Sequence, residues 1–523
     1  MATFSTAPAA YLLQTLAEVP FDLKQASALS QERIRKFSAY GCGLHLFYAT
    51  ERVSKDSLDA LFQLAREMDV MQKMKAMQSG KRVNFSENRS VLHTATRDIF
   101  TDPSGFSDVE RASKLSTLEL EKLSEFLKEI NRENRFTDIV QIGIGGSCLG
   151  PKCISHALKY LGKDTRKIHF LSNIDPDAVV RLLKKINPST TLFIAVSKSG
   201  RTTETVTNVH FISEYLKKCG VNPRDHLVSV TQKGTLMDDS TKYRRTFYIW
   251  DYIGGRYSVT SMVGAVIISC LVGEEIYLEF LRGAHSMDRV ASIENPSKNL
   301  PLLSALLNIW NRNFLKFPTK AILPYSDGLL YLPAHLQQCS MESNGKRVDS
   351  RGKVVSFSTA PIIWGDIGTD GQHSFYQFLH QGTDIVPAEF IGFKHSQYDM
   401  DMRFNGTTSQ NKLIANLLAQ VLTLAIGKED SNLNKEFPGN RPSRILFAKQ
   451  LDPHTLGAIL SYFEHTIAFE GFLWGINSFD QEGVQLGKVI AEQILNHFSQ
   501  ERVPADKPLP ASLSSLMQCI EEV

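Results

Sequence analysis

Apolar residues divide the chain into a helical start, two segments of alternating strands and helices, and a helical end. Up to about residue 130 we expect mostly helix, and from Leu58 to Met74 apolar residues recur at three- and four-residue spacing. From about residue 138, short apolar runs alternate with longer amphipathic stretches. Such alternation is typical of a parallel, doubly wound α/β sheet.

The two alternating segments follow one another along the chain. In the first, we expect strands at 138–143, 168–171, 191–196 and 226–230, with helices at 176–186 and up to about residue 218. In the second, which follows Asn295-Pro296, we expect strands at 321–325, 360–364, 385–393 and 444–448, with helices at about 329–340, 370–380, 408–427 and 453–474. The halves share no sequence identity strong enough to indicate a repeat.

Two polar loops follow predicted strands of the first segment, and ligands bind at this edge of such sheets. One loop, 143–147, is rich in glycine and ends with Ser147. The other, 197–203, places Lys198 and Arg201 at the start of a helix, where the backbone amides favour an anion. A glycine turn and an ordinary helix cap are the alternative interpretations. Neither loop has a Walker A or dinucleotide-binding sequence, so a phosphate here belongs to a small substrate.

Three further positions suit proton transfer and stabilisation of negative charge. Glu342 lies where an apolar helix ends before Asn344-Gly345, which can half-bury the carboxylate of a general base. We place His373 at the start of a helix. Two glycines precede Arg256 and indicate a tight turn that presents its guanidinium. Taken singly, a helix-end glutamate, a capping histidine and a surface arginine explain these residues as well.

The stretch 478–488 separates two apolar helical patterns near the end of the chain. Ser478 and Asp480 favour a helix break and an N-cap, so Gln481 is expected to open the last helix. Lys488 follows two helical turns later and would share a face with Gln481. A surface lysine is the alternative interpretation.

Charge and cysteine content exclude several classes of protein. The 523 residues include 58 basic and 55 acidic side chains, so no global field favours nucleic acid or a membrane surface. The seven cysteines lack disulfide-framework or zinc spacing, which indicates a reducing compartment. The N-terminus has no charged leader pattern, and the apolar run 262–272 is too short to span a bilayer. We therefore expect a cytoplasmic protein.

Taken together, these blocks resemble the glucose-6-phosphate isomerase (phosphoglucose isomerase) family. Two long family signatures are matched by 251–264 and by 475–488. Further matching blocks lie at 84–97, 143–151, 197–205, 342–346 and 368–373. The resemblance covers roughly residues 80 to 490.

The resemblance implies an α/β protein with two sugar-isomerase (SIS) domains of three-layer α/β/α type, mostly parallel sheets, and helical N-terminal and C-terminal arms. We expect boundaries at 1–120 for a helical segment, 121–290 and 291–500 for the two domains, and 501–523 for a tail. The family also implies a homodimer with active sites at the subunit interface. Its reaction interconverts glucose 6-phosphate and fructose 6-phosphate, in glycolysis and gluconeogenesis, with no cofactor, metal or nucleotide.

Site residues follow from the resemblance, position by position. Glu342 matches the base that moves a proton between C2 and C1, and Arg256 matches the arginine that steadies the enediolate. His373 matches the ring-opening residue, which in the family comes from the partner subunit, and Lys488 matches the lysine beside the ring oxygen. The phosphate-contacting set is matched by Gly146, Ser147, Ser197, Lys198, Ser199, Thr202 and Gln481.

Some positions depart from the family pattern. Gly200 replaces an aromatic residue and Arg201 a threonine, while Gln485 and Asp370 stand where glutamate and asparagine are usual. Two other functions fit the same sequence. One is a broader isomerase that also accepts mannose 6-phosphate, and the other is a non-catalytic SIS-type sugar-phosphate sensor.

Overall fold

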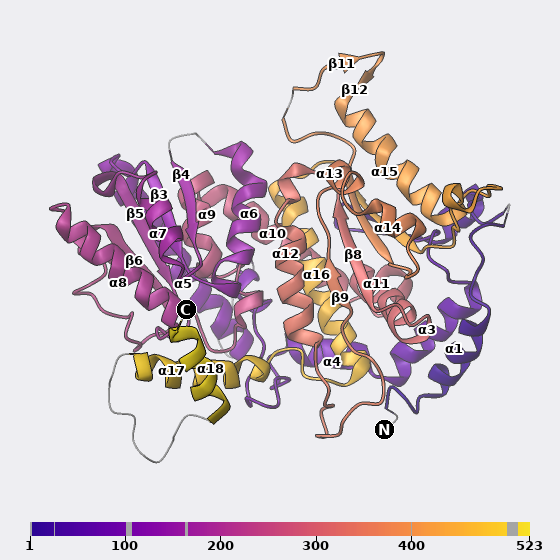
Figure 1. The fold of residues 1–523 in the computed structure, drawn as a ribbon, viewed down its shortest axis with the longest axis horizontal. Coiled ribbons are helices and arrows are strands. Elements are labelled where there is room, and N and C mark those ends of the chain that lie inside the picture. The colour runs from indigo at the N-terminus through magenta and orange to yellow at the C-terminus, as the bar shows by residue number, and fades with distance from the viewer. Residues whose placement is uncertain are drawn as a thin grey trace. The chain divides into compact units, whose positions relative to one another are not determined.

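The computed structural model describes residues 3–25, 27–100, 107–162, 166–398, 400–498 and 511–522. The chain forms two compact units, Met1–Ser478 and Phe479–Val523. The larger unit contains two main sheets, each covered by helices (Figure 1). The smaller unit contains the helices α17 (Gln485–Phe498) and α18 (Ala511–Glu521).

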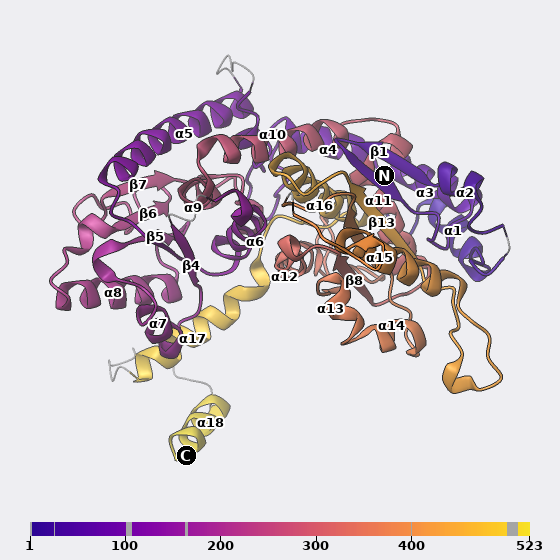
Figure 2. The same ribbon diagram turned by 90° about the horizontal axis from the view of Figure 1, so that it is seen from above.

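The first main sheet has five parallel strands in the order β4-β3-β5-β6-β7. They are β3 (Asp138–Ile142), β4 (Lys167–Leu171), β5 (Thr191–Val196), β6 (Leu227–Thr231) and β7 (Arg245–Tyr248). Apolar side chains of β3 and β5 pack on one face against α7 (Pro176–Leu183) and α8 (Thr203–Lys218). α5 (Asp108–Glu133) and α9 (Met262–Val272) lie on the other face (Figure 2). Both faces are therefore covered, which explains why β3 and β5 are buried throughout.

The second main sheet has six strands in the order β1-β2-β13-β10-β8-β9. They are β1 (Ser38–Gly41), β2 (Leu44–Phe47), β8 (Thr319–Pro324), β9 (Ile362–Trp364), β10 (Ala388–Phe393) and β13 (Ser443–Ala448). The last four are parallel, whereas the β1–β2 hairpin pairs antiparallel with β13. α14 (Tyr376–Gln381) and α15 (Ser409–Ile426) pack on one face.

Two long helices, α10 (Glu274–Ala291) and α16 (Pro453–Trp474), lie between the sheets (Figures 1 and 2). Glycines allow their backbones to approach closely. A methyl group on Gly457 would lie 1.9 Å from the Phe280 carbonyl oxygen, and one on Gly283 would lie 1.8 Å from that of His454. From Thr455 onward α16 is buried along its entire length, so it forms the centre of the larger unit.

The other helices and strands complete the fold. They are α1 (Pro8–Glu18), α2 (Gln31–Lys36), α3 (Lys55–Glu67), α4 (Val70–Gln78), α6 (Leu149–Leu158), α11 (Leu300–Ile309), α12 (Leu332–Gln337), α13 (Gly368–Gln372), β11 (Arg403–Phe404) and β12 (Thr407–Thr408). Among the described residues, one apolar window, Gly255–Val272, has the length and composition to cross a membrane, but 83% of it is buried inside the fold.

The predicted strand–helix alternation is confirmed in both segments, with three differences. The N-terminal segment is not only helical, because β1 and β2 extend the second sheet. β7 adds a strand to the first sheet that the apolar pattern does not predict. The helix expected at 370–380 is two short helices, α13 and α14.

Candidate active site

Three loops meet at the carboxyl edge of the five-stranded sheet, after β3, β5 and β7. Gly146 in the first loop lies directly against the third. A methyl group on Gly146 would stand 2.2 Å from the carbonyl carbon of Gly255 and 2.7 Å from the amide nitrogen of Arg256. Gly145 has a φ of +57°, a conformation that glycine adopts without strain. The glycines of this loop therefore serve close packing, and they leave Ser147 half-buried at its end.

The second loop gathers hydroxyl groups before α8. The Oγ atoms of Ser197 and Thr202 lie 2.9 Å apart, and Ser199 is exposed. Lys198 donates to the carbonyl oxygens of Asp251 and Ile253 at 2.9 and 2.8 Å, so it ties this loop to the third one. Burial, assisted by a nearby arginine, lowers the pKa of Lys198 to about 8. Ser147, Ser197, Lys198 and Thr202 thus all belong to loops at one edge of the sheet.

Arg256 is buried, which excludes a surface arginine. Its Nε donates to Ser343 Oγ at 2.6 Å, and its Nη2 donates to the Ser478 carbonyl oxygen at 2.6 Å. Nη1 lies 3.6 Å from the Oε2 atom of Glu342. These contacts fix the guanidinium plane and direct one edge toward the Glu342 carboxylate.

Glu342 ends a π-helical turn, Gln338–Glu342, that follows α12. Its side chain is 20% exposed, so the predicted half-burial is confirmed. Gln338 Nε2 donates to Glu342 Oε2 at 2.8 Å and lies close to Gly145. Sequence reasoning missed Gln338, although its four-residue spacing from Glu342 places both on one helical face.

Two hydrogen-bond acceptors of Arg256, Ser343 and Ser478, are themselves held by polar contacts. Ser343 Oγ lies 2.8 Å from the hydroxyl group of Tyr257, and the Tyr257 ring stacks on His93 with centroids 4.9 Å apart. Burial and the charge of Arg97 hold the pKa of His93 well below its ordinary value, so its imidazole is neutral.

On the other side, Ser478 Oγ donates to Asn344 Oδ1 at 2.6 Å. Asn344 Nδ2 in turn donates to Glu470 Oε2 at 3.1 Å and to the Ile467 carbonyl oxygen. A methyl group on Gly471 would overlap Ser478 Oγ at 1.8 Å. The glycine therefore makes room for the serine that supports Arg256.

His373 follows α13 instead of starting a helix, so that expectation is wrong. Its amide donates to the Asp370 carbonyl oxygen at 3.0 Å, which ends α13. The glycines at 368 and 371 limit the first helix, since glycine is a poor helix former. The residue is exposed, and among the described residues its imidazole makes no hydrogen bond or ion pair.

Gln481 and Lys488 belong to the smaller unit. Gln481 has a φ of −148° and precedes a short 3₁₀ turn, Glu482–Val484. It therefore does not open the last helix, and the expected two-turn spacing to Lys488 is wrong; Gly483 weakens regular helix here. Lys488 lies in the first turn of α17. The roles of both residues remain predictions.

Comparison with known proteins decides which family has this arrangement. A family model described as phosphoglucose isomerase matches residues 47–515. The chain belongs to the phosphoglucose isomerase family. The glucose-6-phosphate isomerase of Protochlamydia amoebophila (strain UWE25) is 52% identical over 496 residues, 94% of this chain and 92% of that protein. That of Chlamydia pneumoniae is 51% identical over 489 residues, 92% of this chain and 93% of that protein.

A solved phosphoglucose isomerase structure has the same fold. The crystal structure of the glucose-6-phosphate isomerase from Chlamydia trachomatis D/UW-3/Cx matches with a TM-score of 0.96 at 46% identity, over 99% of this chain and 100% of that one. The predicted family and α/β fold are thereby confirmed. Within the described ranges, no group of three or more His, Cys, Asp or Glu side chains could hold a metal ion.

Proposed function

We propose that this chain catalyses the reversible isomerisation of glucose 6-phosphate and fructose 6-phosphate through ring opening and a cis-enediolate. One observation carries the proposal: the half-buried Glu342 carboxylate lies 3.6 Å from a guanidinium that is fixed on its other edges. Family membership and the names of relatives at about 50% identity support the same reaction.

Glu342 is the proton carrier of this mechanism. In the direction of fructose 6-phosphate, its carboxylate takes the proton from C2 of the open-chain aldose and returns it to C1. The hydroxyl proton on O2 moves to O1, so protons balance. Because the two carbons are adjacent, one carboxylate serves both steps. A positioned base contributes roughly 10²–10⁴ in rate, about 3–5 kcal/mol. Gln338 orients this carboxylate by its hydrogen bond to Oε2.

Arg256 stabilises the negative charge that develops on the enediolate oxygens. A buried guanidinium that is already held by Ser343 and Ser478 needs no reorganisation when this charge forms. We expect its contribution to match that of an oxyanion donor, on the order of 10²–10³ in kcat.

The loops at the edge of the five-stranded sheet anchor the phosphate group. Hydroxyl groups of Ser147, Ser197, Ser199 and Thr202, with the Lys198 ammonium, suit the phosphate oxygens, and Gly146 lets the backbone approach. Binding energy from this remote group orients C1 and C2 at Glu342.

The remaining roles concern ring opening and assembly. We assign ring opening to His373 and Lys488, with Gln481 as a further phosphate contact. The exposed imidazole of His373 supports a site completed across a homodimer interface. All seven cysteines are free, which supports the cytoplasm, where the reaction serves glycolysis and gluconeogenesis.

Glu342→Gln tests the proposal, because glutamine keeps the shape and removes the base. We expect kcat to fall by about three orders of magnitude while sugar-phosphate binding persists. Glu121→Gln, on the exposed face of α5, is the matched control and should remain fully active. Both proteins are assayed in coupled turnover of fructose 6-phosphate without added metal. Wild type that binds but does not turn over would be a sensor, and equal turnover of mannose 6-phosphate would indicate the broader isomerase.

A further inference from the structure

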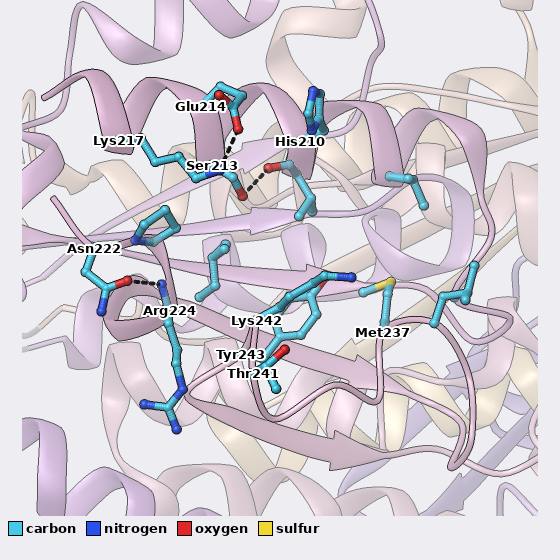
Figure 3. A pocket seen from close by; sticks show the side chains of 16 residues that line it. His210, Ser213, Glu214, Lys217, Asn222, Arg224, Met237, Thr241, Lys242 and Tyr243 are labelled. Atoms are coloured by element: carbon cyan, nitrogen blue, oxygen red, sulfur yellow. Dashed lines mark hydrogen bonds and ion pairs between the residues drawn. The ribbon is translucent and has the colours of Figure 1, made fainter. Parts of the chain in front are cut away.

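A cavity lies on the face of the five-stranded sheet that α8 covers, between α8 and the segment 222–243 (Figure 3). Its volume is about 550 Å³, within the range of small-molecule sites. Figure 3 shows Ser213 and Lys217 of α8 on one side of this space, and Lys242, Tyr243 and Met237 on the other. None of these residues belongs to the active site described above.

The cavity combines an apolar floor with a basic rim. Its apolar lining is formed by Val206, Val209, Leu227, Leu236, Met237 and Tyr243. Met237 and Tyr243 are only 3% and 5% exposed and support this lining from beneath, whereas Val206 and Leu236 offer accessible apolar area that suits an aromatic ring. Leu236 is 69% exposed, and such a side chain gains from being covered by a ligand.

Three cationic side chains, Lys217, Arg224 and Lys242, line the rim. Lys217 is paired with Glu214 at 2.8 Å and Lys242 with Asp239 at 3.2 Å, whereas Arg224 makes no ion pair within the described residues. The Nε of Arg224 donates to the Ser240 carbonyl oxygen, and within the described residues its Nη groups have no hydrogen-bond partner. A carboxylate, sulfonate or phosphate group on the ligand would therefore find charged donors at this rim.

One wall of the cavity is continuous with the predicted phosphate loop. Gly200, which lines the cavity, has a φ of +65°, and a methyl group on it would lie 2.8 Å from Thr235 Cβ. Thr235 Oγ1 lies 2.8 Å from Thr231 Oγ1, which donates to the Ser197 carbonyl oxygen at 2.7 Å. A ligand that presses on Leu236 and its neighbours thus bears on the loop that begins at Ser197.

We propose that this cavity binds a small aromatic anion and that its occupancy is coupled to phosphate binding at the loop 197–202. The coupling rests on the proposed function of that loop, whereas the binding does not. Linkage requires the coupling to be reciprocal: phosphate changes the affinity for the aromatic anion by the same factor as the anion changes the affinity for phosphate.

The binding test uses 8-anilinonaphthalene-1-sulfonate as probe and the full chain as protein, with fluorescence titration as readout. Lys217→Ala removes a rim cation and exposes the charge of Glu214, so we expect affinity to fall five- to tenfold. Lys218→Ala is the matched control, because it removes the same charge from the neighbouring position, which does not line the cavity. It should change affinity less than twofold.

A second variant blocks the space itself. Ser213→Phe fills the cavity from α8, two to three turns away from the phosphate loop, and should abolish saturable binding while activity persists. Probe binding that Ser213→Phe and Lys217→Ala leave unchanged would overturn the site. Equal affinity for the uncharged N-phenyl-1-naphthylamine would overturn its preference for an anion.

The coupling is measured with inorganic phosphate at saturating concentration. We expect the dissociation constant of the probe to shift at least threefold in wild type, and Lys198→Ala, which removes the ammonium of the phosphate loop, should reduce this shift. A constant that phosphate leaves unchanged would overturn the coupling and leave the site. A shift that persists in full in Lys198→Ala would indicate direct competition at the rim and would also overturn the coupling. Because no turnover is involved, failure of the isomerase proposal would not alter this result.

Discussion

The two main sheets place their charged residues differently. In the five-stranded sheet, Asp138 opens β3 and lies 2.8 Å from His169 of β4, while the lysine and hydroxyl groups of the site lie in loops beyond the strands. In the six-stranded sheet, charged side chains from three neighbouring strands are buried together. Glu389 of β10 is buried between Lys320 of β8 and Arg444 of β13, each at 2.6 Å.

These buried charges connect to the segment that carries Glu342, the proposed proton carrier. Lys320 donates to Asn308 Oδ1 at 3.1 Å, and Asn308 Nδ2 donates to Glu470 Oε1 at 2.5 Å. Glu470 Oε2 accepts from Asn344, two residues after Glu342. Glu470 makes no ion pair within the described residues, and its two carboxylate oxygens accept from the amides of Asn308 and Asn344. A network whose side chains are all hydrogen-bonded rigidifies its surroundings. Under the proposed function, loops of the five-stranded sheet supply the phosphate contacts and Arg256, whereas the buried network of the six-stranded sheet holds the segment that carries Glu342.

The largest expected effect is on stability. Glu389→Ala leaves Lys320 and Arg444 buried without their shared partner, and this should cost about 3–5 kcal/mol in the free energy of unfolding. Glu121→Ala, on the exposed face of α5 over the five-stranded sheet, should change the free energy of unfolding by less than about 0.5 kcal/mol. Denaturant unfolding measures both. A loss below 1 kcal/mol for Glu389→Ala would remove the contrast between the sheets.

The contribution of Glu389 to the free energy of unfolding depends on pH. Burial alone would raise its pKa, but Arg444 and Lys320 lower the pKa of Glu389 to about 2. Its contribution to stability is thus complete above the ordinary glutamate pKa and decreases as the pH falls from there toward 2.

Two serine variants should change kcat and KM differently, with effects smaller than that of Glu389→Ala. Ser343→Ala removes the acceptor of Arg256 Nε, and one hydrogen bond to a charged group is worth about 1.5–3 kcal/mol. We expect kcat to fall at least tenfold with little change in KM. Ser147→Ala should instead raise KM for the sugar phosphate. Steady-state kinetics of both variants measure these changes. A raised KM for Ser343→Ala with a lowered kcat for Ser147→Ala would contradict the assigned roles.

The smallest effect concerns alkaline pH. Because burial lowers the pKa of Lys198 to about 8, its ammonium is lost as the pH rises through that value, and kcat/KM should fall severalfold above it. Lys198→Arg keeps its charge and should flatten this alkaline limb. A wild-type profile that stays level to pH 9.5 would exclude Lys198 as a charged phosphate contact.

The sequence predicts those strands and helices whose burial shows in the residues of the element itself. β5 is correct to the residue because it is buried on both faces and reads as one apolar run. β1 and β2 were missed, because four-residue strands carry too few positions to show a period. Motifs identified Arg256 and Glu342, but no local pattern indicates what holds them. The acceptors of Arg256 lie 87 and 222 positions away in the sequence, and only the tertiary fold brings them together.

Glu342, in the proposed mechanism, carries a proton between two carbons. Turnover of fructose 6-phosphate in D₂O, followed by NMR of the sugar, tests this role most directly. A carboxylate that exchanges with solvent should place deuterium on C2 of glucose 6-phosphate over many turnovers, and Glu342→Gln should lose this incorporation together with kcat. Conversion to equilibrium with no carbon-bound deuterium would instead indicate a direct hydride shift and would contradict the role of Glu342.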